Sequence, residues 1–292
     1  MSSSHLFVGV AGWEFPHWHG VVYPKPSPRG FHPLDFLADR VDAVEITSTF
    51  YRSPRPELVR LWAAKTAHNG SFRFTARLHR AFTHERNLDA KHVKEFIQAL
   101  DQLGDRLGCL LMQFPYAFRF TEENKDFLIR LRRAFHMFPL VAELRHSSWT
   151  CPEGMGTLID YHVGFANLDQ PQKHGATAPG SYLTSAVGYV KLHGRECGAA
   201  HEMYDDREER ATGNRYLYTL VELTEWKSRV EHLRRFAENC YVVFNNDGAG
   251  KSVVNALQMQ GLLSGCETLQ EAARSAAGAR SPRPHLFSRT AA

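Results

Sequence analysis

Charged side chains interrupt several short apolar segments of this sequence, and they are the residues best suited to chemistry. Carboxylates and imidazoles transfer protons or ligate metals, while arginine and lysine bind phosphate or carboxylate groups. A divalent metal is one cofactor such residues could use, with Glu45, Glu143 and His193 as candidate ligands. The candidate catalytic residues are Glu45, Glu143, Arg145 and His193.

The spacing of these residues places them on shared faces of predicted strands, because side chains two positions apart in a strand point the same way. Glu143 and Arg145 share one face, as do Lys191 and His193, in segments that are otherwise apolar. Unpaired charges in a protein interior are costly, so these residues must pair, bind a ligand or face water. The alternative to a functional site is a paired ion network that only fills space.

Eight short runs rich in β-branched and aromatic residues have the length and composition of strands. Helical patterns separate them, with apolar residues at i, i+3, i+4 and i+7 in residues 91–103 and similar spacing in 122–135, 221–236 and 252–263. The predicted strands are 7–13, 41–51, 72–80, 109–115, 140–146, 163–169, 188–194 and 241–247.

This alternation predicts an α/β fold consisting of a single TIM-type (β/α)8 barrel with irregular connections. The competing fold, an open doubly wound sheet, would need a glycine-rich phosphate turn after the first strand, where this sequence has GWEFPHWHG. Residues 170–185 lack periodicity and are expected to form a long loop. Because no linker divides the chain, residues 1–265 are predicted to form one barrel domain and 266–292 a flexible basic tail.

In a (β/α)8 barrel the active site lies at the carboxyl ends of the strands, where the polar residues of this sequence concentrate. Basic residues there are suited to phosphate or carboxylate groups, and tryptophans to excluding water or stacking on a sugar or base. The candidates for these binding roles are Arg77, Arg80, Lys191, Trp13, Trp18 and Trp149. His193, Cys197 and His201 are spaced four positions apart, so on a helix they could ligate one zinc ion. The intervening glycines disfavour that helix.

The composition is that of an ordinary globular protein and excludes collagen-like, disordered and disulfide-rich classes, with 43% hydrophobic and 23% charged residues among 292. Five scattered cysteines favour a reducing compartment. No segment has the length of a bilayer-spanning helix, and the first residues lack a signal-peptide pattern. We therefore expect a cytoplasmic protein without a membrane partner, whose net charge of +4 is too small to indicate nucleic acid by itself.

Several motifs, in order, resemble those of the YecE-like proteins, the family called domain of unknown function 72. The resemblance covers about residues 6–263 and implies a TIM-type barrel, a site at its strand ends and no established reaction. The motifs that carry it are AGWEFPHWHGVVYP, DAVEITSTFYRSP, FRFTARLHRAFTHE, LGDRLGCLLMQFP, VAELRHSSW, KLHGR and VVFNNDGAGKSVVNA.

The resemblance also extends the set of candidate site residues. Three positions depart from the family pattern: Thr47 stands where asparagine is usual, Arg77 where lysine is usual and His79 where proline is usual. Arg77 keeps the charge but excludes chemistry that needs a neutral amine. The substrate-binding candidates that the resemblance supports, besides the tryptophans, are Tyr51, Arg80, His84, Gln113, His146, Asn245 and Asn246.

Three functions remain open from these residues. The first is an enzyme, either an acid–base or a metal-assisted hydrolase, lyase or isomerase, acting on a small polar or anionic substrate that is phosphorylated or sugar-like. The second is a nucleic-acid binding or processing protein, favoured by the basic tail and by aromatic residues interleaved with arginine and histidine. The third is a scaffold barrel without catalysis. The oligomeric state is not indicated.

Overall fold

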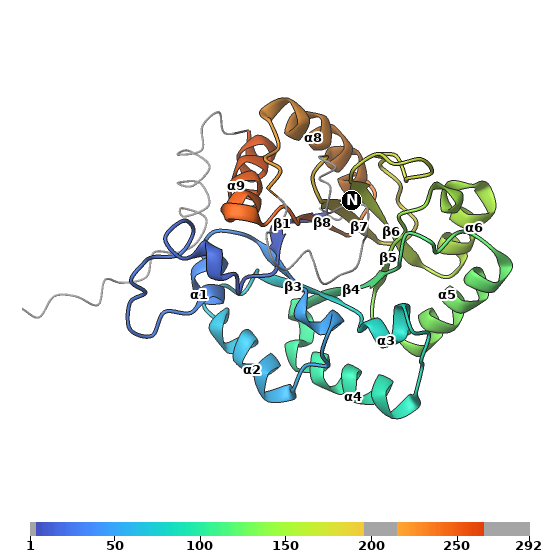
Figure 1. Cartoon of the computed structure of the whole chain (residues 1–292), viewed down its shortest axis with the longest axis horizontal. Coiled ribbons are helices and arrows are strands. Elements are labelled where there is room, and N and C mark those ends of the chain that lie inside the picture. The colour runs from blue at the N-terminus through green and yellow to red at the C-terminus, as the bar shows by residue number, and fades with distance from the viewer. Residues whose placement is uncertain (1–3, 196–214, 266–292) are drawn as a thin grey trace, which may run out of the picture.

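A computed structural model of the chain describes residues 4–195 and 215–265. Eight parallel strands close into a barrel in chain order, with β8 pairing back onto β1, and the helices surround it (Figure 1). This arrangement confirms the predicted single (β/α)8 barrel. The predicted tail, 266–292, lies outside the described residues, as do Cys197 and His201 of the weak zinc pattern.

All eight predicted strands are present, but several end earlier than the sequence pattern suggests. The predicted strand 41–51 ends at Ile46, because the chain then turns and the Thr49 hydroxyl donates hydrogen bonds to the carbonyl oxygens of Ile46 (2.9 Å) and Arg77 (2.7 Å). The strands are β1 (His5–Ala11), β2 (Ala43–Ile46), β3 (Arg73–Arg77), β4 (Leu107–Gln113), β5 (Leu140–Glu143), β6 (Val163–Asp169), β7 (Val187–Leu192) and β8 (Asn239–Phe244).

Most of the helices begin at a side chain that accepts a hydrogen bond from one of the first backbone amides, α2 and α9 being the exceptions. Asp89 and Thr121 cap two of them, and Thr219 forms a capping box with Glu222. No helix among the described residues is long and apolar enough to cross a membrane. The helices are α1 (Pro33–Ala38), α2 (Pro56–Lys65), α3 (Arg80–Thr83), α4 (Ala90–Leu100), α5 (Glu122–Ala134), α6 (Pro152–Asp160), α8 (Leu220–Arg234) and α9 (Lys251–Ser264).

The connection between β6 and β7 is the most irregular part of the barrel. Residues 170–186 form neither helix nor strand, as the lack of periodicity predicts. An isolated bridge between His146 and Ala176 holds this loop against the segment that follows β5. The part of the loop around Ala176 therefore lies at the carboxyl ends of the strands, at the same end of the barrel as the polar residues, whereas Thr184 is already back at the amino end, where its hydroxyl donates to the Val163 carbonyl oxygen at 2.6 Å.

Small residues inside the barrel make room for large polar ones. The inner face of β1 carries Gly9 and Ala11, and a Cβ atom added at Gly9 would lie 1.9 Å from the carbonyl oxygen of Ala43. Gly108 on β4 leaves room for Tyr241, because a Cβ atom added at Gly108 would lie 1.9 Å from the Tyr241 hydroxyl oxygen; Tyr241 and Tyr189 are both buried. Above this layer the interior becomes charged, which is where the candidate site begins.

Candidate functional site

Two buried glutamates face one lysine at the top of the barrel interior. Glu45 on β2, Glu143 on β5 and Lys191 on β7 have no solvent exposure. The Lys191 ammonium donates to Glu45 Oε1 at 3.0 Å and to Glu143 Oε2 at 2.9 Å. The period-two pattern of three separate strands thus brings the predicted residues together, since inward side chains at one level of a closed barrel must meet.

Each glutamate also binds one arginine. Arg77 Nε on β3 donates to Glu45 Oε1 at 2.6 Å, and Arg145 Nε and Nη2 donate to Glu143 Oε1 at 3.0 and 2.8 Å. Three cationic side chains therefore contact two carboxylates in the described part of the chain, and these five side chains together carry a charge of +1 (three minus two) with the glutamates ionised.

Asn245 and His193 close these contacts into a ring. Arg77 Nη2 lies 3.1 Å from Asn245 Oδ1, and Asn245 Nδ2 lies 3.2 Å from His193 Nδ1. His193 Nε2 in turn lies 3.3 Å from Glu143 Oε1. We call this closed circuit, together with Arg145 on Glu143, the polar ring; in order, the circuit runs through Arg77, Asn245, His193, Glu143, Lys191 and Glu45.

The ring fixes the proton on the His193 imidazole. A guanidinium only donates, so the Asn245 atom facing Arg77 is its oxygen and the atom facing His193 is its NH2 group. His193 Nδ1 must then accept, which leaves the proton on Nε2, 3.3 Å from Glu143 Oε1. The neutral imidazole thus has its N–H on the Glu143 side and its lone pair toward Asn245.

The charges in the ring set its protonation. Burial alone would raise the pKa of Glu45, but the Lys191 ammonium and the Arg77 guanidinium outweigh burial and lower that pKa to about 2. Burial likewise opposes the effect of Lys191, Arg145 and His193 on Glu143, whose pKa lies well below its usual value. For His193, burial lowers the pKa more than the Glu143 carboxylate raises it. The resting site therefore holds two carboxylates and one neutral imidazole.

Tyr189 is a member of the site that our sequence analysis missed. Its buried hydroxyl donates to Glu45 Oε2 at 2.7 Å and lies 3.3 Å from the Thr75 hydroxyl. The signal was present in the sequence, because Tyr189 has the same parity on β7 as Lys191 and His193.

The candidate metal ligands do not fit a divalent ion. The Lys191 ammonium lies between Glu45 and Glu143, where an ion shared by these carboxylates would have to lie. Within residues 4–195 and 215–265, no group of three or more His, Cys, Asp or Glu side chains is arranged to hold a metal. The cation that lies between the two glutamates is thus the Lys191 ammonium group.

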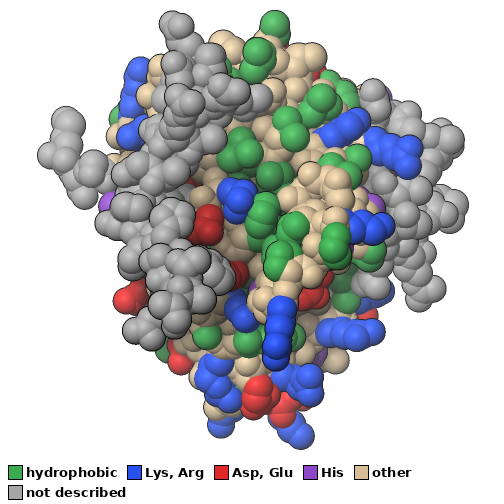
Figure 2. Space-filling view, turned by 90° about the vertical axis from the view of Figure 1, so that its left-hand side faces the viewer, with side chains coloured by type: hydrophobic (Ala, Val, Ile, Leu, Met, Phe, Trp, Pro, Cys, Tyr) green, Lys and Arg blue, Asp and Glu red, His purple; other side chains and the backbone are tan. Residues whose placement is uncertain are grey.

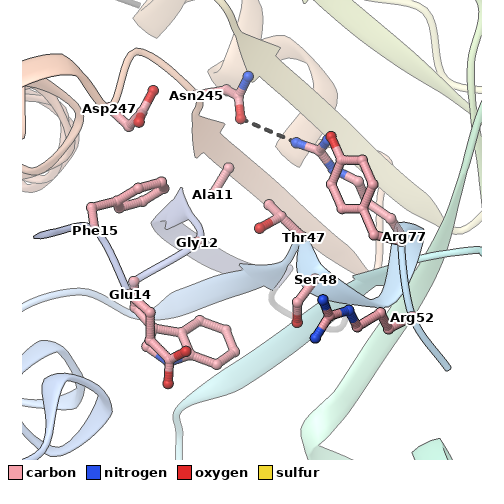
Figure 3. Close-up of a pocket in the computed structure, with 12 residues that line it drawn as sticks. Ala11, Gly12, Glu14, Phe15, Thr47, Ser48, Arg52, Arg77, Asn245 and Asp247 are labelled. Carbon is pink, nitrogen blue, oxygen red and sulfur yellow. Dashed lines mark hydrogen bonds between the residues drawn. The ribbon is translucent and has the colours of Figure 1, made fainter. Parts of the chain in front are cut away.

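A cavity of about 350 Å³ opens beside the polar ring, and Arg77 and Asn245 belong to both. Figure 3 shows the Arg77 and Arg52 side chains on one side of this cavity, with Phe15 on the other. The buried indole N–H of Trp13 has no hydrogen-bond partner among the described residues. The complete lining is Ala11, Gly12, Trp13, Glu14, Phe15, Thr47, Ser48, Tyr51, Arg52, Arg77, Asn245 and Asp247. Glu14, Phe15 and Arg52 were not among our candidates.

Three predicted residues have structural contacts instead of lining the cavity. The Trp18 indole donates to the Asp247 carbonyl oxygen at 2.7 Å, and the Trp149 indole to the Phe118 carbonyl oxygen at 2.8 Å. Asn246 Nδ2 donates to the Tyr216 carbonyl oxygen at 2.9 Å. Each of these three side chains is fully buried.

The remaining candidates lie around the barrel mouth on the β3–β5 side. Arg80 pairs with Glu85 at 3.2 Å, and His146 Nδ1 accepts from the Ser148 amide at 3.1 Å. Burial, Arg80 and Arg145 lower the pKa of His84 to about 4. Gln113 is buried, and its Oε1 has no hydrogen-bond partner in the described part of the chain.

Comparison with known proteins assigns this barrel to a family. The sequence model of one family, described as "Protein of unknown function DUF72", matches residues 7–278. The chain belongs to the DUF72 family. This confirms the resemblance that the motifs indicate.

Relatives of this DUF72 protein include members from distant bacteria. The UPF0759 protein YunF of Bacillus subtilis is 23% identical over 274 residues, which cover 88% of this chain and 94% of YunF. The UPF0759 protein YecE of Escherichia coli K12 is 27% identical over 117 residues, 39% of each chain.

Solved structures of DUF72 proteins have the same fold. The crystal structure of a DUF72 family protein from Thermotoga maritima is 28% identical, with a TM-score of 0.74 over 89% of this chain and 99% of that one. One from Enterococcus faecalis is 24% identical, with a TM-score of 0.74 over 89% and 95%.

Proposed function

We propose that this DUF72 barrel is an enzyme that binds a small anionic substrate, phosphorylated or sugar-like, in the cavity beside Arg77. The observation that carries the proposal is the pair of guanidinium groups, Arg52 and Arg77, on one wall of a cavity that also has aromatic side chains in its lining. A guanidinium binds phosphate and carboxylate groups through paired, charge-assisted hydrogen bonds. Arg77 is the charged ring member that borders the cavity, so the anionic group would bind there.

The rest of the cavity suits a ring-shaped polar ligand. Trp13, Phe15 and Tyr51 provide aromatic surface on which a sugar could pack. Arg52 adds a second guanidinium to the wall (Figure 3), and the carboxylate of Asp247 offers an acceptor for hydroxyl groups.

The two glutamates have an electrostatic part in this proposal. With pKa values below their usual range they are ionised, and they hold the three cations in place instead of donating protons. The neutral His193 is the group able to take up a proton, and the adjacent Glu143 would stabilise the resulting imidazolium. These roles support acid–base chemistry of the hydrolase, lyase or isomerase type.

A thermal-shift screen of the purified protein tests the proposal, because a ligand that binds only the native state raises the melting temperature. The panel contains sulfate, inorganic phosphate, sugar phosphates and short oligonucleotides. We expect a rise with phosphorylated small molecules that is reduced in Arg52→Ala and Arg77→Lys. Removing a hydrogen bond to a charged group costs about 1.5–3 kcal/mol, roughly a tenfold to hundredfold loss of affinity.

Arg55→Ala is the matched control, because Arg55 is exposed like Arg52 and does not line the cavity. Its ligand response should equal that of the wild type. No shift with any small anion would refute the proposal. A shift with oligonucleotides alone would favour nucleic-acid binding instead, although the face in Figure 2 shows basic side chains interspersed with acidic ones.

A further inference from the structure

We propose that anion binding in the cavity is coupled to the uptake of one proton by His193, and that Asn245 is the positioning residue that links the two events. This inference rests on the proposed function, because it concerns the same cavity. It adds a property that anion binding alone does not require, namely a dependence of affinity on pH.

Asn245 is the only polar ring member besides Arg77 that borders the cavity within the described residues. Its amide oxygen accepts from Arg77 Nη2 at 3.1 Å, and its NH2 group faces His193 Nδ1 at 3.2 Å. As long as Arg77 holds the amide in this orientation, a proton on His193 Nδ1 would face another donor. The anion-free ring therefore disfavours the imidazolium.

An anion bound to Arg77 would change this geometry. The anion competes with Asn245 Oδ1 for the Arg77 N–H groups, which allows the amide to turn and present its oxygen to His193 Nδ1. A proton from the solvent then binds Nδ1, while Nε2–H keeps its contact with Glu143. The Nδ1–H bond forms as an O–H bond of a hydronium ion breaks, and Oδ1 exchanges one donor for another.

The charge of the ring favours the same coupling. Protonation of His193 would add a positive charge beside Arg77, Arg145 and Lys191, whereas a bound anion would offset that added charge. Each ligand thereby lowers the cost of binding the other, and by linkage the effect is reciprocal. An anion at Arg77 therefore raises the affinity of His193 for a proton.

The charged groups that face His193 come from two directions. Glu143 and Arg145 face it from β5 and its C-terminal extension, Lys191 lies on its own strand, and Asn245 on the β8 side is neutral. Burial lowers the pKa of His193 more than Glu143 raises it, with Arg145 and Lys191 lowering it further. The carboxylates stay ionised near neutral pH, which leaves the imidazole to respond there.

Titration of sulfate binding against pH tests the coupling, because sulfate does not change its own charge between about pH 5 and 8. We expect the affinity of the wild-type protein to rise as the pH falls, by up to about tenfold per pH unit for one proton. His193→Gln keeps a donor toward Glu143 but cannot titrate, so its sulfate affinity should not vary with pH.

His17→Gln is the matched control, because His17 contacts the Asp247 carbonyl oxygen (3.1 Å) at the cavity wall but lies outside the ring. It should retain the wild-type slope. Sulfate binding that is independent of pH in the wild type would overturn the coupling and leave the proposed function standing. Absence of binding by sulfate, phosphate and sugar phosphates alike would refute both.

Nitrogen-15 NMR of the histidines in the anion-free, wild-type protein tests the proposed protonation state of His193 without any ligand. We expect the proton of His193 on Nε2 and a lone pair on Nδ1. Asn245→Asp places an acceptor toward both Arg77 and His193, so Nδ1 should stay protonated to higher pH in this variant. A proton on Nδ1 in the neutral wild-type imidazole, or no change in Asn245→Asp, would contradict the role of Asn245.

Discussion

Two clusters of carboxylates and guanidiniums lie at the same end of the barrel, with opposite charge balance. The polar ring has three cations for two carboxylates. The rim cluster, which we define as Arg195 with Asp169, Glu222 and Glu225, has one guanidinium for three carboxylates, at 3.0, 3.1 and 3.2 Å. Among the described residues, the same residue types therefore form a cluster with more cations at the centre and one with more carboxylates at the edge.

The pKa shifts follow this balance. Burial raises the pKa of Asp169 more than Trp226 and Arg195 lower it, whereas the two cations beside Glu45 reverse the effect of burial. Exposure differs as well, since the Glu225 side chain is 49% exposed and Glu143 is fully buried. The number of cations in contact with a buried carboxylate therefore decides whether its pKa is lowered, as for Glu45, or raised, as for Asp169.

Lys191→Met should have the largest effect on stability, because it leaves Glu45 and Glu143 facing each other without the ammonium between them. Breaking a buried ion pair from one side costs about 3–5 kcal/mol. We expect a loss of this size in the free energy of unfolding, measured by urea denaturation. The same substitution at Lys227, a half-exposed partner of Glu231, should cost less than about 1 kcal/mol. Equal losses of stability in the two variants would show that the ion pairs of the polar ring contribute no more than a surface ion pair.

Acidification should reveal that the pKa shifts of Glu45 and Asp169 have opposite signs. The pKa of Glu45 falls from 4.5 to about 2 on folding, so its stabilisation is complete above pH 4.5 and is lost as the pH falls toward 2. That difference corresponds to about 3 kcal/mol. Asp169 has a raised pKa in the folded protein, so its protonation on acidification partly offsets the loss.

Unfolding free energies at pH 7, 4.5 and 3 check this expectation in the wild type and in Asp169→Asn. The variant should lose more stability between pH 4.5 and 3 than the wild type, because the offset is gone. A flat profile in the wild type would show that Glu45 is not held ionised by its cations.

Glu225→Gln should have the smallest effect, below about 1 kcal/mol, because exposed ion pairs are screened by water. The matched substitution Glu143→Gln removes the same charge from the polar ring, where Lys191 and Arg145 depend on it. Denaturation of both variants at low and high salt sharpens the comparison. A large, salt-independent loss in Glu225→Gln would mean that the rim cluster is as structurally important as the ring.

Local sequence patterns predicted most of the fold and part of the candidate site. Alternation along single strands predicted the barrel and the inward direction of Glu45, Glu143 and Lys191. It missed Tyr189, although parity marked it, because tyrosine in a strand ordinarily indicates packing. It also could not separate Trp13, which lines the cavity, from Trp18 and Trp149, whose indoles bond to backbone carbonyl groups.

Local periodicity in the sequence specifies the eight strands, most of the helices between them and the strand faces that carry charge. How those charges meet depends on the tertiary fold. The barrel closure and register set Lys191 between two glutamates and Asn245 between Arg77 and His193, contacts between residues 48 to 168 positions apart. Contacts between residues so far apart in the sequence depend on strand register and loop paths, which no local periodicity specifies. These contacts fix the charge of the site.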